Sequence, residues 1–239
     1  MKTSRRYSRR IPTLSVFALA FFLASCDDDT PTNGNPPTTT TAPPATGGTG
    51  FLRAGALTFD ARNVDVVIGS QTISALSYPE VSSYLELDAG EYRVQFFPAG
   101  SRTAPIGETS VTLSDDDAAT VALVGLSAPQ PAVFEDELDT NGSQAGVTLV
   151  NTVPDFPAPF DLRVVNGPTL ASGVSYLETS DMSDLNAGSY NIELLRGGTE
   201  EVVATATNNN LASGASYSLY ATGSLRRGDI QLVLATDAP

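Results

Sequence analysis

The chain lacks most of the residue types that enzymes use for acid–base, nucleophilic and metal chemistry. Its 239 residues include no histidine, no tryptophan and a single cysteine, Cys26, and the only lysine is Lys2. Without histidine, no side chain titrates near neutral pH in its ordinary state. Without spare cysteine or lysine, disulfides, zinc thiolate sites and Schiff-base catalysis are excluded. These absences predict a protein that is not an enzyme and needs no metal or cofactor.

Positive charge is also scarce beyond the first residues. Five of the 13 basic residues precede Cys26 and all 27 acidic residues follow it, which leaves eight arginines and a balance of −19 from Cys26 onward. A surface this acidic repels nucleic-acid phosphates and anionic lipid headgroups. We therefore expect no nucleic-acid partner and no direct contact of the folded surface with a membrane.

The first 25 residues have the layout of an export signal. Residues 1–10 are basic, and residues 11–22 are mostly apolar. This run is too short to span a bilayer but is typical of the core of a signal peptide. It ends in Leu23-Ala24-Ser25-Cys26, which resembles the lipobox of bacterial lipoproteins. The resemblance implies cleavage before Cys26 and acylation of that cysteine. The alternative is an ordinary secretory signal followed by a chance cysteine.

Acyl chains on Cys26 predict a lipid-anchored protein of the cell envelope, because several chains hold a protein stably on a membrane. Asp27, Asp28 and Asp29 follow directly. Acidic runs at this place resemble the surface-export signals of some outer-membrane lipoproteins. In enteric bacteria, however, an aspartate right after the cysteine is an inner-membrane retention signal. We expect the outer membrane, on its periplasmic or surface face, and the sequence leaves the leaflet open.

Residues 26–50 form a tether in this interpretation. Threonine, proline and glycine dominate the segment, which has almost no apolar side chain. Such a composition cannot bury enough surface to fold, so it predicts a disordered, partly extended linker. The tether is expected to hold the folded part clear of the headgroups.

Two copies of one β-rich module follow the tether. Leu87-Asp88-Ala89-Gly90-Glu91-Tyr92 recurs as Leu185-Asn186-Ala187-Gly188-Ser189-Tyr190, with Gly188 lying 98 residues after Gly90. Each copy runs into a strict alternation of apolar and polar residues, which is typical of a half-buried strand. A tyrosine at the start of such a strand also looks like the tyrosine corner of Greek-key sandwiches. We expect both rings to be buried and both hydroxyls to bind backbone.

Short strands separated by glycine, proline, asparagine and aspartate fill both copies. In the first copy we expect strands at residues 56–59, 64–68, 71–76, 83–87, 92–97, 106–113, 119–125 and 132–137. In the second copy we expect them at residues 147–151, 160–165, 169–173, 181–185, 190–194, 202–208, 217–222 and 230–235. This spacing predicts an all-β chain of two tandem antiparallel β-sandwich domains, Ig-like or transthyretin-like with Greek-key connections. The domains are expected at residues 51–140 and 141–239, each able to fold alone.

The second copy carries a family resemblance. Residues 150–164 read Val-Asn-Thr-Val-Pro-Asp-Phe-Pro-Ala-Pro-Phe-Asp-Leu-Arg-Val. This resembles the opening signature of the bacterial domain-of-unknown-function 4397 family, roughly Val-His-Ala-Ser-Pro-Asp-Ala-Pro-Ala-Val-Asp-Val. Asn151 stands where the family usually has histidine, and the first copy keeps only Val64-Asp65-Val66-Val67. The resemblance implies tandem envelope or secreted modules and no activity, because the family has no established biochemical role.

Residues 152–159 are interpreted as an insertion present in the second copy alone. Functional loops are often longer than their counterparts, so Asp155 and Phe156 are the residues predicted to contact a partner. The competing interpretation is that Pro154, Pro157 and Pro159 only stiffen a crossover between the two sheets.

Three other charged runs have structural interpretations. Asp115-Asp116-Asp117 lacks the spaced ligands of a calcium loop and is interpreted as a solvated turn. The run Glu135-Asp136-Glu137 is interpreted as protecting an edge strand against pairing with another sheet. Arg226-Arg227 is interpreted as a hairpin tip.

These features predict a non-catalytic envelope protein that serves as a binding module or a structural spacer. The alternative is a carbohydrate-binding or enzyme-accessory module, against which the absence of tryptophan counts. An envelope protein or a glycan is the expected partner, and the oligomeric state is open. A binder is expected to expose an aromatic or apolar patch on the loops at one end, and a spacer none.

Overall fold

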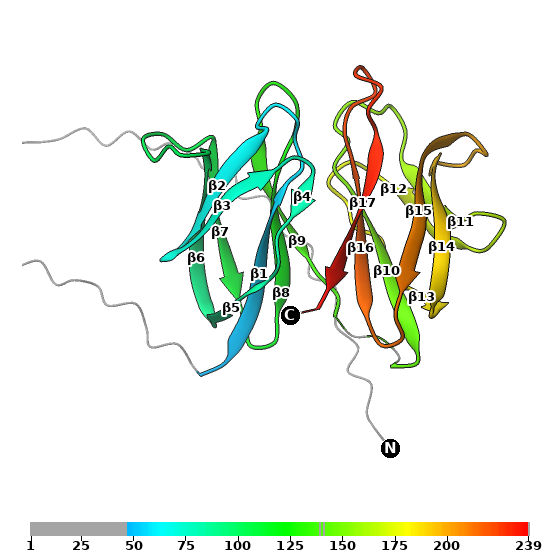
Figure 1. Ribbon diagram of the computed structural model, residues 1–239, viewed down its shortest axis with the longest axis horizontal. Helices are drawn as coiled ribbons and strands as arrows, with labels where there is room; N and C mark the ends of the chain where they lie inside the picture. Colours follow the sequence, from blue (N-terminus) through cyan, green and yellow to red (C-terminus); the bar gives the residue numbers. More distant parts are fainter. Residues whose placement is uncertain (1–46, 139, 141, 239) are drawn as a thin grey trace, which may run out of the picture. The chain divides into compact units, whose positions relative to one another are not determined.

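The computed structural model describes residues 47–138, 140 and 142–238, and the regular elements among them are β-strands (Figure 1). The predicted signal peptide, Cys26 and the tether up to residue 46 lie outside the described residues. In the part that is described, no helix is long and apolar enough to cross a membrane.

The first repeat is a sandwich of two sheets. One sheet has the order β4 (Glu80–Val81), β1 (Thr49–Ala56), β8 (Ala118–Val124) and β9 (Gln130–Glu135), and β5 (Leu85–Asp88) also pairs with β1. The other sheet has the order β3 (Gln71–Ser77), β2 (Asn63–Ile68), β6 (Gly90–Pro98) and β7 (Gly107–Leu113). A hydrophobic core fills the space between them, with Leu52, Val66, Phe96 and Val121 at its centre.

The second repeat has the same arrangement. One sheet has the order β13 (Ser183–Asn186), β10 (Gln144–Asn151), β16 (Ser216–Thr222) and β17 (Gln231–Asp237). The other sheet has the order β12 (Thr169–Val174), β11 (Phe160–Val164), β14 (Gly188–Arg196) and β15 (Val202–Leu211). A separate core surrounds Leu149, Phe160 and Leu219. In both repeats the first strand runs parallel to the strand before the last, whereas pairs such as β1–β5 and β16–β17 are antiparallel. The all-β tandem sandwich predicted from the sequence is therefore confirmed.

The first strand is the element that the sequence placed wrongly. We expected it at residues 56–59, but β1 runs from Thr49 to Ala56 and so begins inside the segment assigned to the tether. Leu52 and Ala54 point into the core of the first repeat, while Arg53 and Gly55 on the other face are also buried. A strand that is covered on both faces loses the alternation by which half-buried strands are recognised.

The two tyrosine corners form as predicted. The Tyr92 hydroxyl donates to the carbonyl oxygen of Asp88 at 2.8 Å, and the Tyr190 hydroxyl donates to that of Asn186 at 2.9 Å. Both rings are half-buried rather than buried, because each lies near the end of its sandwich, where solvent reaches the ring. The corners tie β6 and β14 to the short strands that precede them.

A buried or half-buried aspartate in β2 and in β11 holds two neighbouring segments together. The Asp65 carboxylate accepts hydrogen bonds from the amides of Ala75 at 2.8 Å and Gly100 at 3.0 Å. In the second repeat Asp161 accepts from the amides of Gly173 at 2.7 Å and Gly198 at 2.8 Å. These backbone hydrogen bonds keep the pKa of Asp65 below its usual range.

The residue clamped by this aspartate has a left-handed backbone in both repeats, with φ 53° at Ala75 and φ 71° at Gly173. A residue with a side chain is strained in this conformation, which lowers the stability of the folded chain. Glycine avoids the strain but loses more backbone entropy on folding, which offsets part of the gain. We therefore expect Ala75→Gly to raise the free energy of unfolding by about 0.5–1 kcal/mol. Gly173→Ala is the reciprocal control and is expected to lower it by a similar amount, since nothing lies within 4 Å of the added methyl group. Denaturant unfolding measures both, and equal signs for the two variants contradict the argument.

Candidate functional site

One end of the folded part collects four connections from each repeat, and we call it the loop end. Strands β1 and β8 run parallel and finish together. Strands β3 and β6 finish where β2 begins, with Asn63 opposite Ser77 and Val64 opposite Pro98. In the second repeat β10 and β16 likewise run parallel and finish together, and β12 and β14 pair antiparallel with β11. The loop end comprises residues 57–62, 78–79, 99–106, 125–129, 152–159, 175–182, 197–201 and 223–230.

Contacts between the two repeats join these loops into one surface. The Arg227 guanidinium lies 3.4 Å from the centre of the Phe59 ring, and that of Arg62 lies 4.7 Å from it. Arg227 also approaches Asp60 at 4.0 Å. The Gln231 amide donates to the Tyr78 hydroxyl at 3.4 Å. The aromatic ring at this place is thus covered by arginine side chains from both repeats.

Three of the four large aliphatic side chains that are exposed among the described residues lie in or beside the loops of the loop end. Among the described residues, four large apolar side chains are exposed: Val133, Leu177, Val202 and Leu225. Leu177 and Leu225 lie in the loops themselves, and Val202 begins β15 next to the loop of residues 197–201. Leu177 also has φ 66°, a conformation that costs a branched side chain about 1–2 kcal/mol. Strain of this kind concentrates at functional sites.

Asp155, predicted to contact a partner, is bound within the chain. Its carboxylate accepts hydrogen bonds from the Ser224 hydroxyl at 2.7 Å, the Leu225 amide at 2.8 Å and the Arg226 amide at 3.2 Å. Burial works against the charge, but these hydrogen bonds outweigh it and lower the pKa of Asp155. Asp155 therefore fixes the loop that presents Leu225.

Phe156, the second residue predicted to contact a partner, packs at the edge of the second core. Its ring centre lies 4.5 Å from that of Phe160. Contact of Asp155 and Phe156 with a partner stays a prediction, and the structure assigns both residues supporting contacts inside the second repeat.

The segment of residues 152–159 is not an insertion. The first repeat has a loop at the same place, residues 57–62, which is two residues shorter. There Asp60 accepts a hydrogen bond from the Ser127 amide at 2.6 Å, as Asp155 does from the Leu225 amide. The interpretation that only the second copy has this segment was wrong, because its proline-rich composition hid a loop that both copies share.

Removing the Asp155 carboxylate is expected to destabilise the second repeat. Asp155→Ala leaves one hydroxyl and two amides without their acceptor, which predicts a loss of about 1–3 kcal/mol in the free energy of unfolding. Asp88→Ala removes an exposed carboxylate from β5 and serves as the control, with little expected change. Equal stability of the Asp155 variant and the control in denaturant titrations contradicts the supporting role.

The seam between the two repeats is a second candidate site. Arg53 on β1 has a side chain that is only 1% exposed. Its guanidinium donates to the Asp237 carboxylate, to the Thr236 carbonyl oxygen at 3.0 Å and to the Tyr220 hydroxyl at 3.2 Å, all in the second repeat. Its Nε donates to Thr120 Oγ1 at 2.7 Å in the first repeat. A buried arginine therefore connects the two sandwiches.

The two carboxylates around Arg53 occupy equivalent positions of the repeats. Asp136 follows β9 and its amide donates to Ala118, the first residue of β8, while Asp237 lies opposite Ser216, the first residue of β16. Each carboxylate accepts from a hydroxyl of the neighbouring strand: Thr120 donates to Asp136 at 2.6 Å, and Ser218 donates to Asp237 at 2.9 Å.

The seam contains a single arginine because the position equivalent to Arg53 in the second repeat has a different residue. Arg53 pairs with Thr120 across β1 and β8, and Thr148 pairs with Ser218 across β10 and β16. Thr148 is thus the counterpart of Arg53 in the second repeat. The seam therefore has two carboxylates from equivalent positions and one guanidinium between them.

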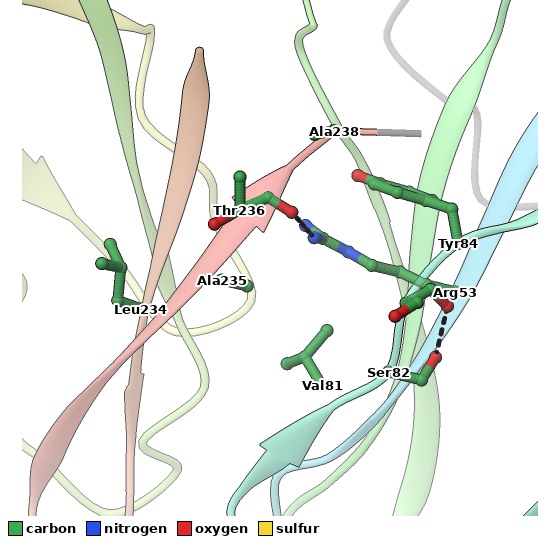
Figure 2. Close-up of a pocket in the computed structure, with 9 residues that line it drawn as sticks. Arg53, Val81, Ser82, Tyr84, Leu234, Ala235, Thr236 and Ala238 are labelled. Carbon is green, nitrogen blue, oxygen red and sulfur yellow. Dashed lines mark hydrogen bonds between the residues drawn. The ribbon is translucent and has the colours of Figure 1, made fainter. Parts of the chain in front are cut away.

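A groove of about 310 Å³ opens beside this arginine. Figure 2 shows Val81, Ser82 and Tyr84 on one side and Leu234, Ala235 and Thr236 on the other, with Arg53 reaching across. The Arg53 guanidinium lies 4.4 Å from the centre of the Tyr84 ring, and Phe51 meets the same ring edge-on at 6.4 Å. Because these contacts occupy both the guanidinium and the ring, the groove offers a ligand mainly hydroxyl and aliphatic groups.

The remaining charged runs divide between confirmed and corrected interpretations. Asp115 and Asp117 accept hydrogen bonds from the amides of Thr49 at 3.1 Å and Ser114 at 2.8 Å, as expected for a turn. Among the described residues, no group of three or more acidic or cysteine side chains is placed to hold a metal ion. The interpretation of Asp136 as an exposed edge charge was wrong, since its side chain is 1% exposed and faces Arg53 at 3.4 Å.

The sequence did not predict the buried cluster at the seam, which consists of Arg53, Asp136, Tyr220 and Asp237. Two features of the sequence are consistent with it. Arg53 is a single charge inside the apolar stretch of residues 51–57, and both copies carry an aspartate where their last strand ends. A charge in such a stretch is expected to have a buried partner.

A model of the family described as "Domain of unknown function (DUF4397)" matches residues 50–158 and again residues 145–239. Among solved structures, CBMbc (family CBM26) from Eubacterium rectale Amy13K, in complex with maltoheptaose, is 9% identical with a TM-score of 0.27, covering 80% of this chain and 98% of that chain. The TIE protein of Bacillus anthracis is 12% identical with a TM-score of 0.26, covering 74% and 34%. Scores this low carry no argument about ligand or partner. No match was found among curated proteins.

Proposed function

Because the chain belongs to the DUF4397 family, with two tandem copies of the domain, we propose that it is a non-catalytic, lipid-anchored protein of the cell envelope that binds a protein partner through the loop end. The observation that carries this proposal is the exposure of Leu177, Val202 and Leu225 at one end of the molecule. Large apolar side chains that are exposed on the same end of a fold are candidates for an interaction site. A spacer has no need of them.

The direction of β1 and the charge of the two ends support a partner site at the loop end. The segment that contains Cys26 leads into β1 at Thr49, and β1 runs from there towards the loop end. The described connections at the opposite end contain acidic residues but no lysine or arginine: residues 69–70, 89, 114–117, 136–138, 140, 142–143, 165–168, 187 and 212–215. An end of this charge is repelled by anionic headgroups. Within the folded part, the loop end is therefore the end opposite to the one at which β1 begins.

The side chains at the loop end favour a protein over a glycan. The exposed groups are aliphatic, and the Phe59 ring is covered by Arg62 and Arg227. Protein interfaces use apolar anchors of this kind at their centre. The absence of histidine throughout and of lysine after Lys2 supports the non-catalytic part of the proposal.

A pull-down from solubilised envelope with the acylated full chain tests the binding surface. Replacing Leu177 and Leu225 together by serine is expected to reduce the retained partner at least about tenfold, because losing apolar anchors typically costs more than 1 kcal/mol each. Val133→Ser is the matched control: Val133 is 43% exposed, similar to Leu225 at 47%, but lies on β9 away from the loops.

Three outcomes of this pull-down are informative. Loss of the partner in the loop-end variant alone supports the proposal. Equal retention by wild type and both variants contradicts it. Release of the partner by purified envelope polysaccharide, with no effect of the leucine changes, favours the carbohydrate-binding alternative instead.

The anchor is tested separately. Cys26→Ala removes the sulfur that lipid transfer needs, so the chain is expected either to keep its signal peptide or to appear in the aqueous phase of a detergent partition. Wild-type chain partitions into the detergent phase on the same reasoning. A Cys26→Ala chain that loses residues 1–25 and still partitions with membranes contradicts the lipoprotein assignment.

A further inference from the structure

The seam between the repeats buries one more negative charge than positive charge. Arg53, Asp136 and Asp237 have side chains that are each 1% exposed. Removing an unpaired ionised group from water is costly, and proteins commonly respond by changing its protonation. Two carboxylates that share one guanidinium are therefore a place where a proton is expected to bind.

Among the residues that the structure describes, the other groups that face this cluster do not supply a second positive charge. Tyr84 precedes β5, and Tyr220 lies in β16; burial is the main cause that raises the pKa of each phenol, so both stay neutral. Thr120 of β8, Ser218 of β16 and the Thr236 carbonyl group of β17 complete the surroundings. The residues next to Asp136 in the chain, Glu135 and Glu137, are themselves acidic and exposed.

The cluster is also short of hydrogen-bond donors. Asp136 Oδ2 accepts from the Tyr84 hydroxyl at 2.7 Å and from Thr120 Oγ1 at 2.6 Å. Asp136 Oδ1 is buried without a hydrogen-bond partner, with Arg53 Nη2 at 3.4 Å. Asp237 accepts from Arg53 through Oδ1 and from Ser218 through Oδ2. Of the four carboxylate oxygens of Asp136 and Asp237, Asp136 Oδ1 is thus left without a hydrogen-bond donor.

Hydroxyl geometry decides which carboxylate holds a proton. Thr120 Oγ1 already accepts from Arg53 Nε at 2.7 Å and from the Tyr220 hydroxyl at 2.9 Å, so its own proton is committed to Asp136. A proton on Asp136 Oδ2 would therefore find no acceptor at Thr120. Ser218 instead can rotate and accept a hydrogen bond from Asp237 Oδ2, since a hydroxyl both donates and accepts. Burial, the main cause of the shift, raises the pKa of Asp237 in spite of Arg53.

We propose that the seam binds one proton, carried by Asp237 and shared with Ser218, and that releasing this proton weakens the contact between the two repeats. No co-reactant is involved, because the step is a proton transfer between the carboxyl group and water. Protonation removes one of the two negative charges that share Arg53. Deprotonation restores the uncompensated buried charge, so the seam is tightest in mildly acidic solution.

The pH dependence follows from the direction of the shift. The pKa of Asp237 is raised on folding, so the folded chain binds more protons than the unfolded chain above the usual aspartate range. The stabilisation is complete below the unfolded pKa and is lost as the pH rises through the folded pKa. One proton changes the unfolding equilibrium constant by at most about tenfold per pH unit within this window.

The test is the pH dependence of unfolding of the full chain in detergent, from about the usual aspartate pKa of ~4 up to ~8. Asp237→Asn is neutral at every pH and keeps an oxygen for Arg53, so it is expected to abolish the fall in stability across this window. Asp88→Asn is the matched control, since it places in the first corner the asparagine that the second corner has as Asn186. It is expected to keep the fall.

Carboxyl carbon-13 NMR of the wild-type chain gives a second readout that needs no variant to fold. The proposal expects one aspartate carboxyl group to stay protonated above the usual range and its signal to be missing in Asp237→Asn. The absence of a protonated carboxyl group in the wild type overturns the proposal. So does an unchanged pH dependence in Asp237→Asn, and so does a dependence removed by Asp136→Asn but kept in Asp237→Asn.

Discussion

The arrangement of the two sandwiches depends on the guanidinium of Arg53, buried between a carboxylate of each repeat. Each repeat has a hydrophobic core of its own. A third, smaller cluster joins them: Leu57 and Phe134 come from the first repeat, Val150 and Tyr220 from the second. An apolar contact of this kind permits sliding, whereas directed hydrogen bonds from one planar group fix the register. Arg53 is thus what makes the loops of two domains a single surface.

The seam also shows how two copies of one fold become complementary. The aspartates and hydroxyls are equivalent in both repeats, but the residues facing them differ. Arg53 stands where the second repeat has Thr148, and Ala122 stands where it has Tyr220. The two larger side chains therefore meet each other across the seam, where the Arg53 guanidinium donates to the Tyr220 hydroxyl at 3.2 Å. Two identical faces would bring two arginines or none to the two carboxylates, so the single arginine reflects the difference between the two repeats.

Much of the fold was predictable because alternation and turn residues report local structure. The tyrosine corners at Tyr92 and Tyr190 and most strands lie where the sequence placed them. The pattern failed at β1, which is covered on both faces. It also failed at Asp136, because burial of a charge depends on Arg53, a partner 83 positions away in the chain. The exposure of Leu177 and Leu225 was likewise not predictable, because burial is predicted from the periodic pattern of a strand or helix and a loop has no such pattern.

The aspartates of the signature stretch have a consequence for how relatives of this chain are interpreted. Asp60 and Asp155 bind backbone amides of the loop after the strand that precedes the last, and Asp65 and Asp161 bind amides of a neighbouring strand and turn. Backbone amides are present whatever the surrounding side chains are. A protein that shares these aspartates therefore shares a way of closing a β-sandwich. These aspartates alone therefore do not identify a ligand, because the same hydrogen bonds form whatever side chains the loops carry.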